Sequence, residues 1–315
     1  MIEVAGLRKV YRAAHHDVVA VDELTFSVRP GAVTGFLGPN GAGKSTTMRM
    51  IAGLEAPSAG HALVAGRPFT EHPQPMSALG VLLEAKAMHP GRTARRHLQV
   101  LAATNGLPAR QVDTVLELVG LADAAERRVG AFSMGMGQRL GLAAALLGDP
   151  AGVMLDEPLN GLDPDGIVWM RELLQQMAAQ GRTVFLSSHL MSEMALTADH
   201  LIVVAGGRLL ADESMSDFLA QTPSGVRVAS PQAAQLREAL EQLVAHRRAA
   251  GHPAALTAGP PASAGALIVQ GVTAVEIGQA AQDRSVVLSE LVTVQASLEE
   301  AFMKMTTARV SAHTQ

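Results

Sequence analysis

The 315-residue sequence predicts an α/β protein with a smaller second domain of the α+β type. Three observations carry this prediction. A short apolar segment, 32–37, runs into a glycine-rich loop and then into the helical pattern of 45–52. A second apolar segment, 152–155, ends in an acidic pair. Beyond residue 222, segments of strand length alternate with helical patterns, which favours a separate α+β domain.

The composition excludes several classes of function. The chain has no cysteine, which rules out disulfides, thiolate metal sites and thiol catalysis and fits a reducing compartment. Its net charge is −4 without a block of like charges, so we expect no nucleic-acid partner. The first residues do not form a secretory signal, and no apolar run reaches the roughly 18 residues that span a bilayer. We therefore expect a soluble protein that reaches a membrane only through a partner.

Antiparallel β-structure surrounds one strand–loop–helix unit in the amino-terminal part. Segment 2–10 alternates loosely and predicts a strand that ends at Tyr11, the only tyrosine. Segment 18–28 predicts a pair of strands closed by the turn at 29–31, and 61–65 predicts another short strand.

The loop between the strand at 32–37 and the helix at 45–52 fits the pattern G-x-x-x-x-G-K-S/T. Its glycines let successive backbone N–H groups converge on phosphate oxygens, in front of the helix N-terminus. Lys44 adds a positive charge where β- and γ-phosphates would lie, and the Ser45 hydroxyl can ligate Mg²⁺. We predict that a nucleotide is bound by Gly38, Pro39, Asn40, Gly41, Ala42, Gly43, Lys44, Ser45 and Thr46.

A helical insert follows the next strand. Segment 79–83 predicts a buried strand that runs into Glu84, and 93–119 has helical spacing with a break at 106–108. Segment 132–137 then leads into a helix at 138–147. We place this helical subdomain at about residues 85–150.

The acidic pair Asp156 and Glu157 ends the strand at 152–155. On its own, such a pair favours an ordinary acidic strand end. Downstream of a phosphate loop, it instead predicts one carboxylate on Mg²⁺ and a second beside the γ-phosphate. Asp156 would be the metal-side acid, and Glu157 would orient or deprotonate the attacking water.

The remaining elements of the first domain follow in order. A turn at 160–164 precedes a helix at 166–179. The strand at 183–186 stops at Ser187-Ser188-His189, which puts the His189 ring at the carboxyl edge, where ligands bind in such sheets. Segments 201–205 and 208–211 predict a hairpin.

Over residues 1–221 the chain resembles the ATP-binding subunit of an ABC transporter. Gly38–Thr46 matches the family's Walker A motif, and Val153–Glu157 matches Walker B with its catalytic glutamate. The resemblance implies an ABC-type P-loop ATPase fold, with a mixed sheet core and a helical subdomain. The resemblance also extends to four further places. Phe132–Met136 lies at the signature, Leu159–Asp163 at the D-loop and His189 at the switch histidine. Tyr11 lies where the family stacks an aromatic ring on adenine.

The resemblance implies a head-to-tail dimer with ATP and Mg²⁺ at its interface. Ser133, Gly135 and Asp163 of one chain would contact the nucleotide held by the other. Two positions depart from the family's pattern. The signature reads Phe-Ser-Met-Gly-Met, so Met134 and Met136 replace a glycine and a glutamine. Gln138 could take over part of the role of the missing residues. Glu84 stands where the family has the Q-loop glutamine, and its carboxylate can still ligate Mg²⁺.

The implied function is an ATP hydrolase that powers a separate membrane permease, with export of drugs, antibiotics or other hydrophobic compounds by analogy. Catalysis would fall to Glu157 as base and His189 as γ-phosphate sensor. The protein would be cytoplasmic, held to the inner face of the membrane through its permease. Three alternatives stay open: a non-transport ABC protein acting on ribosomes or DNA, a binding-only self-resistance subunit, and an importer subunit.

The carboxy-terminal domain, 222–315, shows no catalytic constellation. We expect strands at 226–229, 266–270 and 285–294, helices at 231–250 and 272–282, and a loop at 251–265. Ser297-Leu298-Glu299-Glu300 predicts a capping box that opens a last helix. The ending resembles the accessory tail of exporter-type ABC ATPases, and we expect a stabilising or dimerising appendage, or a regulatory domain.

Overall fold

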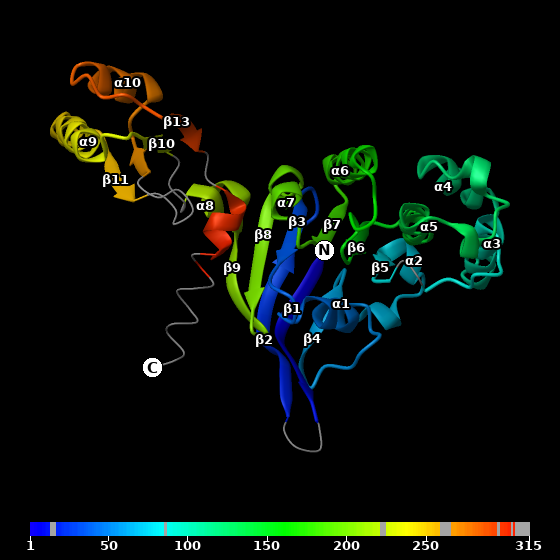
Figure 1. Ribbon diagram of the computed structural model, residues 1–315. Coiled ribbons are helices and arrows are strands. Elements are labelled where there is room, and N and C mark those ends of the chain that lie inside the picture. Colours follow the sequence, from blue (N-terminus) through cyan, green and yellow to red (C-terminus); the bar gives the residue numbers. More distant parts are fainter. Residues whose placement is uncertain are drawn as a thin grey trace. The chain divides into compact units, whose positions relative to one another are not determined.

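The structure is a computed structural model that describes residues 1–12, 17–84, 87–220, 225–258, 266–294, 297–303 and 305. The chain divides into two compact units, Met1–Met215 and Ser216–Gln315 (Figure 1). The predicted boundary at 221–222 and the start of the predicted helical subdomain, at 85, lie outside the described residues. None of the helices in the described ranges is both long and apolar enough to cross a membrane.

A six-stranded mixed sheet forms the centre of the first unit, in the order β5-β6-β7-β3-β8-β9. Five strands are parallel and β9 pairs antiparallel with β8. Every residue of β3, β6 and β7 is buried, as expected for parallel strands covered on both faces. The strands are β3 (Val33–Leu37), β5 (Gly80–Leu82), β6 (Gly152–Leu155), β7 (Thr183–Ser187), β8 (His200–Ala205) and β9 (Arg208–Ser214).

A three-stranded antiparallel sheet, in the order β2-β1-β4, packs against the mixed sheet. The contact includes three phenylalanine rings: Phe26 of this sheet lies 5.7 Å from Phe36 and 5.9 Å from Phe185 between centroids. The prediction of two strands at 18–28 was wrong, because this range forms one strand that pairs with β1 through several register shifts. The strands are β1 (Ile2–Tyr11), β2 (Val18–Val28) and β4 (Ala59–Val64).

The predicted helical insert is present as α3 and α4, which lie beyond the edge strand β5, at the other end of the sheet from β9 (Figure 1). Short elements that the sequence analysis did not predict, including α2 and α7, connect the longer ones. The helices are α1 (Lys44–Ile51), α2 (Pro75–Ala78), α3 (Ala94–Thr104), α4 (Arg110–Leu118), α5 (Met134–Leu146), α6 (Pro164–Ala179), α7 (Met191–Thr197) and α8 (Met215–Ala220), with 3₁₀ turns at Phe69–Glu71, Ala122–Ala124 and Val129–Ala131.

From β10 to β13, the second unit has the chain order βαββαβ with an antiparallel sheet ordered β11-β12-β10-β13, a ferredoxin-like arrangement. Its core joins one face of the sheet to the two helices through residues such as Val228, Leu236 and Ile277. The elements are β10 (Gly225–Ala229), α9 (Ala233–Ala249), β11 (Ala255–Ala258), β12 (Leu267–Gln270), α10 (Ala274–Gln282) and β13 (Glu290–Val294).

Two expectations for this unit were wrong in detail. The range predicted as a loop, 251–265, contains the strand β11, which pairs with β12. The last strand begins at Glu290 and not at Ser285, because Ser285 has a left-handed backbone with φ 56°. Residues 298–303 are helical, and the Ser297 hydroxyl accepts a hydrogen bond from the Glu300 amide at 3.3 Å. The α/β fold with an added α+β unit is thus confirmed.

Candidate functional site

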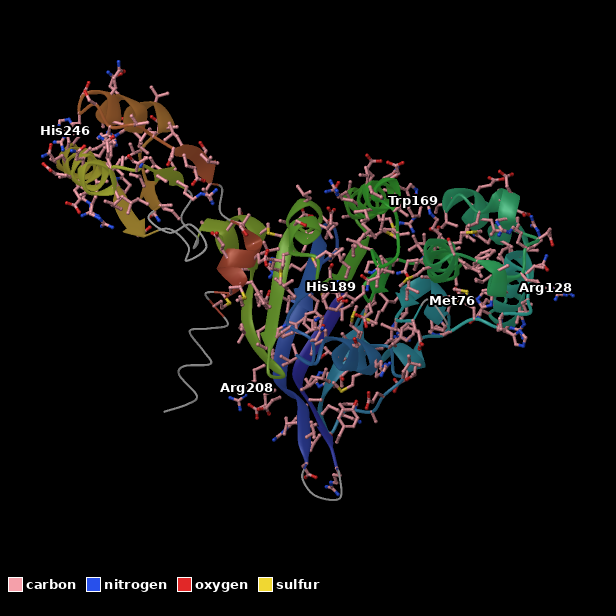
Figure 2. The ribbon with its side chains drawn as sticks, in the orientation of Figure 1. Met76, Arg128, Trp169, His189, Arg208 and His246 are labelled. Atoms are coloured by element: carbon pink, nitrogen blue, oxygen red, sulfur yellow. The ribbon has the colours of Figure 1, made fainter. Side chains whose placement is uncertain are left out.

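The phosphate loop, the acidic pair and the segment ending in His189 meet at the carboxyl edge of three neighbouring parallel strands, β6, β7 and β3. Leu155 pairs with Leu186, and Phe36 pairs with Ser187, so these strands end at nearly the same level. The acidic pair follows β6, the segment ending in His189 follows β7 (Figure 2), and the phosphate loop follows β3. Ligands of open α/β sheets bind at such an edge.

The phosphate loop ends where α1 begins without a capping side chain. The cap position is Gly43, with φ 96°, and the first turn has no acidic residue. The first-turn amides therefore point forward without a side-chain acceptor, which fits an anionic ligand. Two glycines are required by space: a β-carbon on Gly43 would lie 2.4 Å from the Ala20 carbonyl oxygen, and one on Gly38 would lie 2.4 Å from that of Val204.

Lys44 is buried beneath the loop. Its Nζ donates hydrogen bonds to the carbonyl oxygens of Gly38 at 2.6 Å and Pro39 at 3.3 Å. Burial lowers the pKa of the ammonium group, while the negative charges of Glu157 and Asp156 act in the opposite direction. The lysine therefore interacts electrostatically with both carboxylates across the site.

Ser187 ties the two acidic residues together. Its hydroxyl donates to Asp156 Oδ1 at 2.5 Å and accepts from the Glu157 amide at 2.9 Å. The Asp156 amide in turn donates to the Leu82 carbonyl at 2.7 Å, which anchors the end of β6 to β5. Ser187 was not predicted as a site residue, although its place at the end of a predicted strand, before His189, was a usable signal.

Glu157 has a left-handed backbone, with φ 51°. Its Oε2 atom lies 2.7 Å from His189 Nδ1 and accepts a second hydrogen bond from the His189 amide at 3.2 Å. Gln138 of α5 donates to the Glu157 carbonyl at 3.3 Å. The carboxylate is thus held by a histidine whose ring is half-exposed, in the geometry of an oriented base.

Tyr11 and Glu84 lie at the margins of this site. The Tyr11 hydroxyl interacts with Glu55 and with Thr46 in the first turn of α1, and partial burial and the Glu55 bond raise the pKa of Tyr11. Tyr11 as a whole residue is 40% exposed, and Lys9 Nζ lies 5.1 Å from its ring centroid. Glu84 is exposed just beyond β5, on the same sheet edge as Asp156.

The predicted in-trans residues form a second cluster, at the N-termini of α5 and α6. The Ser133 hydroxyl caps α5 by accepting from the Met136 amide at 3.2 Å, and Asp163 caps α6 by accepting from the Gly166 amide at 3.0 Å. Gly135 approaches Gly161 so closely that a β-carbon on it would lie 2.9 Å from the Gly161 carbonyl oxygen. The Ser133 side chain is exposed at this surface.

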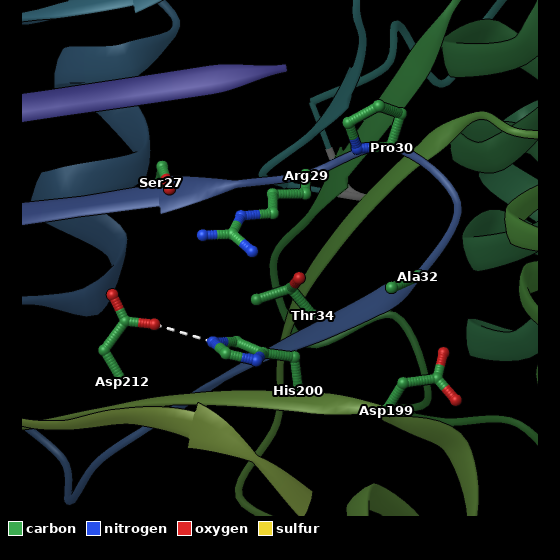
Figure 3. A pocket seen from close by; sticks show the side chains of 8 residues that line it. All are labelled: Ser27, Arg29, Pro30, Ala32, Thr34, Asp199, His200 and Asp212. Atoms are coloured by element: carbon green, nitrogen blue, oxygen red, sulfur yellow. Dashed lines mark hydrogen bonds and ion pairs between the residues drawn. The ribbon is translucent and has the colours of Figure 1, made fainter.

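A hollow of about 400 Å³ lies at the opposite edge of the sheet (Figure 3). Thr34 and His200, at the amino ends of β3 and β8, form part of its wall, and His200 Nε2 pairs with Asp212 at 2.6 Å. Because the phosphate loop follows the other end of β3, this hollow is separate from the site described above.

A phosphate loop with a buried lysine, an Asp–Glu pair at a strand end and a histidine on the glutamate define a P-loop nucleotide hydrolase. Residues 21–160 match the sequence profile of the ABC transporter family, and residues 224–299 match that of a domain of unknown function.

Known proteins extend this similarity. The bacitracin transport ATP-binding protein BcrA of Bacillus licheniformis is 40% identical over 215 residues, covering 67% of this chain and 69% of BcrA. The Nod factor export ATP-binding protein I of Paraburkholderia xenovorans is 35% identical over 249 residues, covering 76% of this chain and 81% of that protein. A solved ATP-binding subunit of an ABC transporter aligns with a TM-score of 0.63 at 28% identity, covering 70% of this chain and 92% of the other. The chain belongs to the ABC transporter family, as an ATP-binding and ATP-hydrolysing subunit.

Proposed function

We propose that this chain powers a separate membrane permease by hydrolysing ATP, and that the cargo is exported. The observation that carries the proposal is the Glu157 carboxylate, held by His189 beside a phosphate loop and Lys44. Export of drugs, antibiotics or other hydrophobic compounds is supported by the relatives, one named for bacitracin transport and another for Nod factor export.

The phosphates of ATP would be bound by the loop from Gly38 to Thr46. The amides at the start of α1, which have no side-chain cap, would donate to the phosphates, and the Lys44 ammonium would supply its charge by exchanging its loop carbonyls for phosphate oxygens. The exposed face of Tyr11 would stack on the adenine, because its hydroxyl already rests against Thr46.

Mg²⁺ fits the oxygen donors at this edge. The Ser45 hydroxyl, the Asp156 carboxylate and the Glu84 carboxylate would hold it, and hydroxyl and carboxylate oxygens are its preferred ligands. When bound, the ion supplies charge neutralisation at the β- and γ-phosphates. Ser187 occupies Oδ1 of Asp156, which leaves the other carboxylate oxygen to face the site.

Glu157 would accept the proton of the attacking water. His189 holds the carboxylate through Nδ1, and the half-exposed remainder of its ring would face the γ-phosphate and sense hydrolysis. Because His189 already holds the Glu157 carboxylate in place, the carboxylate loses little conformational entropy when it contacts the attacking water. The contacts that hold it therefore contribute to the rate of hydrolysis.

The second cluster would complete the site of another copy. In a head-to-tail dimer, the exposed Ser133 hydroxyl, the Gly135 amide and Asp163 would face the ATP held by the partner chain. Charge and hydrogen bonds from two chains would then surround one γ-phosphate. ATP binding would close this dimer and hydrolysis would reopen it.

We assign the ATP-binding domain to residues 1–221, with its helical subdomain at about 85–150. We assign the accessory domain to residues 222–315. The helical subdomain and Glu84 would carry the motion to the permease, and the chain would sit on the inner face of the cell membrane through that partner.

Co-purification tests this proposal. The tagged full chain would be extracted from membranes of its own host, with the tag alone as control, and the retained proteins identified. We expect a polytopic permease. Retention of ribosomes or DNA with no membrane protein would contradict the transport function and favour a non-transport ABC protein.

A further inference from the structure

The start of α5 and the loop before α6, which would both face the partner's nucleotide, contact each other within one chain. Gly161 has φ +75°, and a β-carbon on it would lie 2.4 Å from Cγ and 2.7 Å from Sδ of Met134. The Met134 side chain therefore packs directly against the Gly161 backbone, although the residue as a whole is 57% exposed. The adjacent Gly135 approaches the Gly161 carbonyl in the same way.

Two further residues of α5, next along the helix from this contact, bind neighbouring elements. The Gln138 side chain donates to the carbonyl of Glu157 at 3.3 Å. The Arg139 guanidinium lies 4.3 Å from the ring centroid of Trp169 on α6, a cation–π contact (Figure 2 labels Trp169). The start of α5, the loop to α6 and the base Glu157 thus form one packed unit.

We propose that Met134 is a positioning residue that locks the segment 133–136 to the loop 159–163 of its own chain. The surface offered to the partner's ATP then moves together with the Glu157 that serves the chain's own ATP. This inference rests on the proposed head-to-tail dimer. A flexible thioether suits the role, because it fills the irregular space above a backbone that lacks a β-carbon.

The contact makes a specific prediction of non-additivity. Gly161→Ala places a methyl group where the Met134 side chain lies, and it also strains the backbone at positive φ. Met134→Gly removes the clash and leaves only the strain. Gly181→Ala measures that strain alone, because Gly181 has φ +83° with no atom within 4 Å of a β-carbon.

The experiment measures kcat and KM for ATP in the full chain carrying Met134→Gly, Met134→Leu, Gly161→Ala, and both Met134→Gly and Gly161→Ala together. Leu196→Ala, at a residue of α7 that is 56% exposed, is the surface control. We expect Met134→Gly to lower kcat several-fold with KM nearly unchanged, and Met134→Leu to keep kcat near that of the wild type. The effects of substitutions at residues in contact are coupled. The fold loss of kcat caused by Gly161→Ala should therefore be about tenfold smaller in the Met134→Gly variant than in the wild type.

Strictly additive effects of the two substitutions, or a kcat for Met134→Gly equal to that of the wild type, would overturn the proposal. Thermal unfolding of each variant identifies any that fail to fold, and Met134→Leu then decides alone: loss of kcat in a folded Met134→Leu variant contradicts the positioning role. Failure of the dimer itself is distinguishable, because the unsubstituted chain would then show a specific activity independent of its concentration.

Discussion

Glu157 shows how the site holds a strained residue in place. A non-glycine residue with φ 51° costs about 1–3 kcal/mol, so the surroundings must compensate for it. Its amide donates to Ser187, its carbonyl accepts from Gln138 and its carboxylate pairs with His189. The amide, the carbonyl and one carboxylate oxygen of the residue are thus held by neighbours, which orients the carboxylate.

Glu157→Gln should retain ATP binding and lower turnover by roughly 10²–10⁴-fold, because an amide cannot accept the proton of water. ATP-bound dimer should then accumulate and be detectable by sedimentation. Lys44→Ala is the matched comparison, since it should weaken ATP binding itself. Unchanged turnover in the Glu157→Gln variant would remove Glu157 from the catalytic role.

Ser187→Ala should destabilise the fold and slow turnover together. Ser187 is fully buried, and its loss leaves the Glu157 amide without its acceptor, at about 1–3 kcal/mol of unfolding free energy. Chemical denaturation and steady-state kinetics measure the two effects. Ser27→Ala, on β2 and part of the separate hollow in Figure 3, should change neither; a Ser187→Ala variant that behaves like it would contradict the account.

The sequence predicted Lys44, Asp156, Glu157 and His189 because each occupies a fixed place beside a local pattern, a loop or a strand end. It could not predict how they are held. The bonds of Ser187 depend on the alignment of β6 with β7, and the contact of Met134 with Gly161 depends on tertiary packing. Neither set of contacts has a local signature, although the position of Ser187 at a predicted strand end marked it as a candidate.

At the scale of elements, the site depends on a phosphate loop that packs closely against the backbone of neighbouring segments. Gly43→Ala should abolish ATP binding, because the new methyl group would lie 2.4 Å from the Ala20 carbonyl oxygen and would displace the loop from α1. Gly31→Ala shares the positive φ, at +84°, but meets no atom within 4 Å. It should cost about 1 kcal/mol of stability and leave nucleotide affinity unchanged in titrations. Equal loss of affinity in both variants would contradict the packing argument.

Elements of continuous apolar sequence were the easiest to predict. The buried strands β3, β6 and β7 were all expected, because parallel strands covered on both faces read as apolar runs. The missed elements are short: α2 and β11 have four residues each, too few to show a period. Segment 18–28 reads as two strands locally, and only its pairing with β1 makes it one.

At the scale of the whole molecule, each unit has its own hydrophobic core. We therefore expect residues 216–315 to fold alone and to unfold cooperatively by circular dichroism, and residues 1–215 to bind ATP without them. A non-cooperative melt of the isolated second unit would show that it depends on the first. The ferredoxin-like arrangement of that unit was beyond sequence prediction, since strand order arises from pairing between distant segments.

The central claim is that two copies of the chain complete each ATP site. The most direct test is the specific ATPase activity of the purified full chain over a wide dilution series, with inert protein added to keep total protein constant. Because Ser133 and Asp163 would act on the partner's nucleotide, we predict that the specific activity rises with concentration and saturates when dimer dominates. A specific activity that stays flat from the lowest to the highest concentration would contradict the claim.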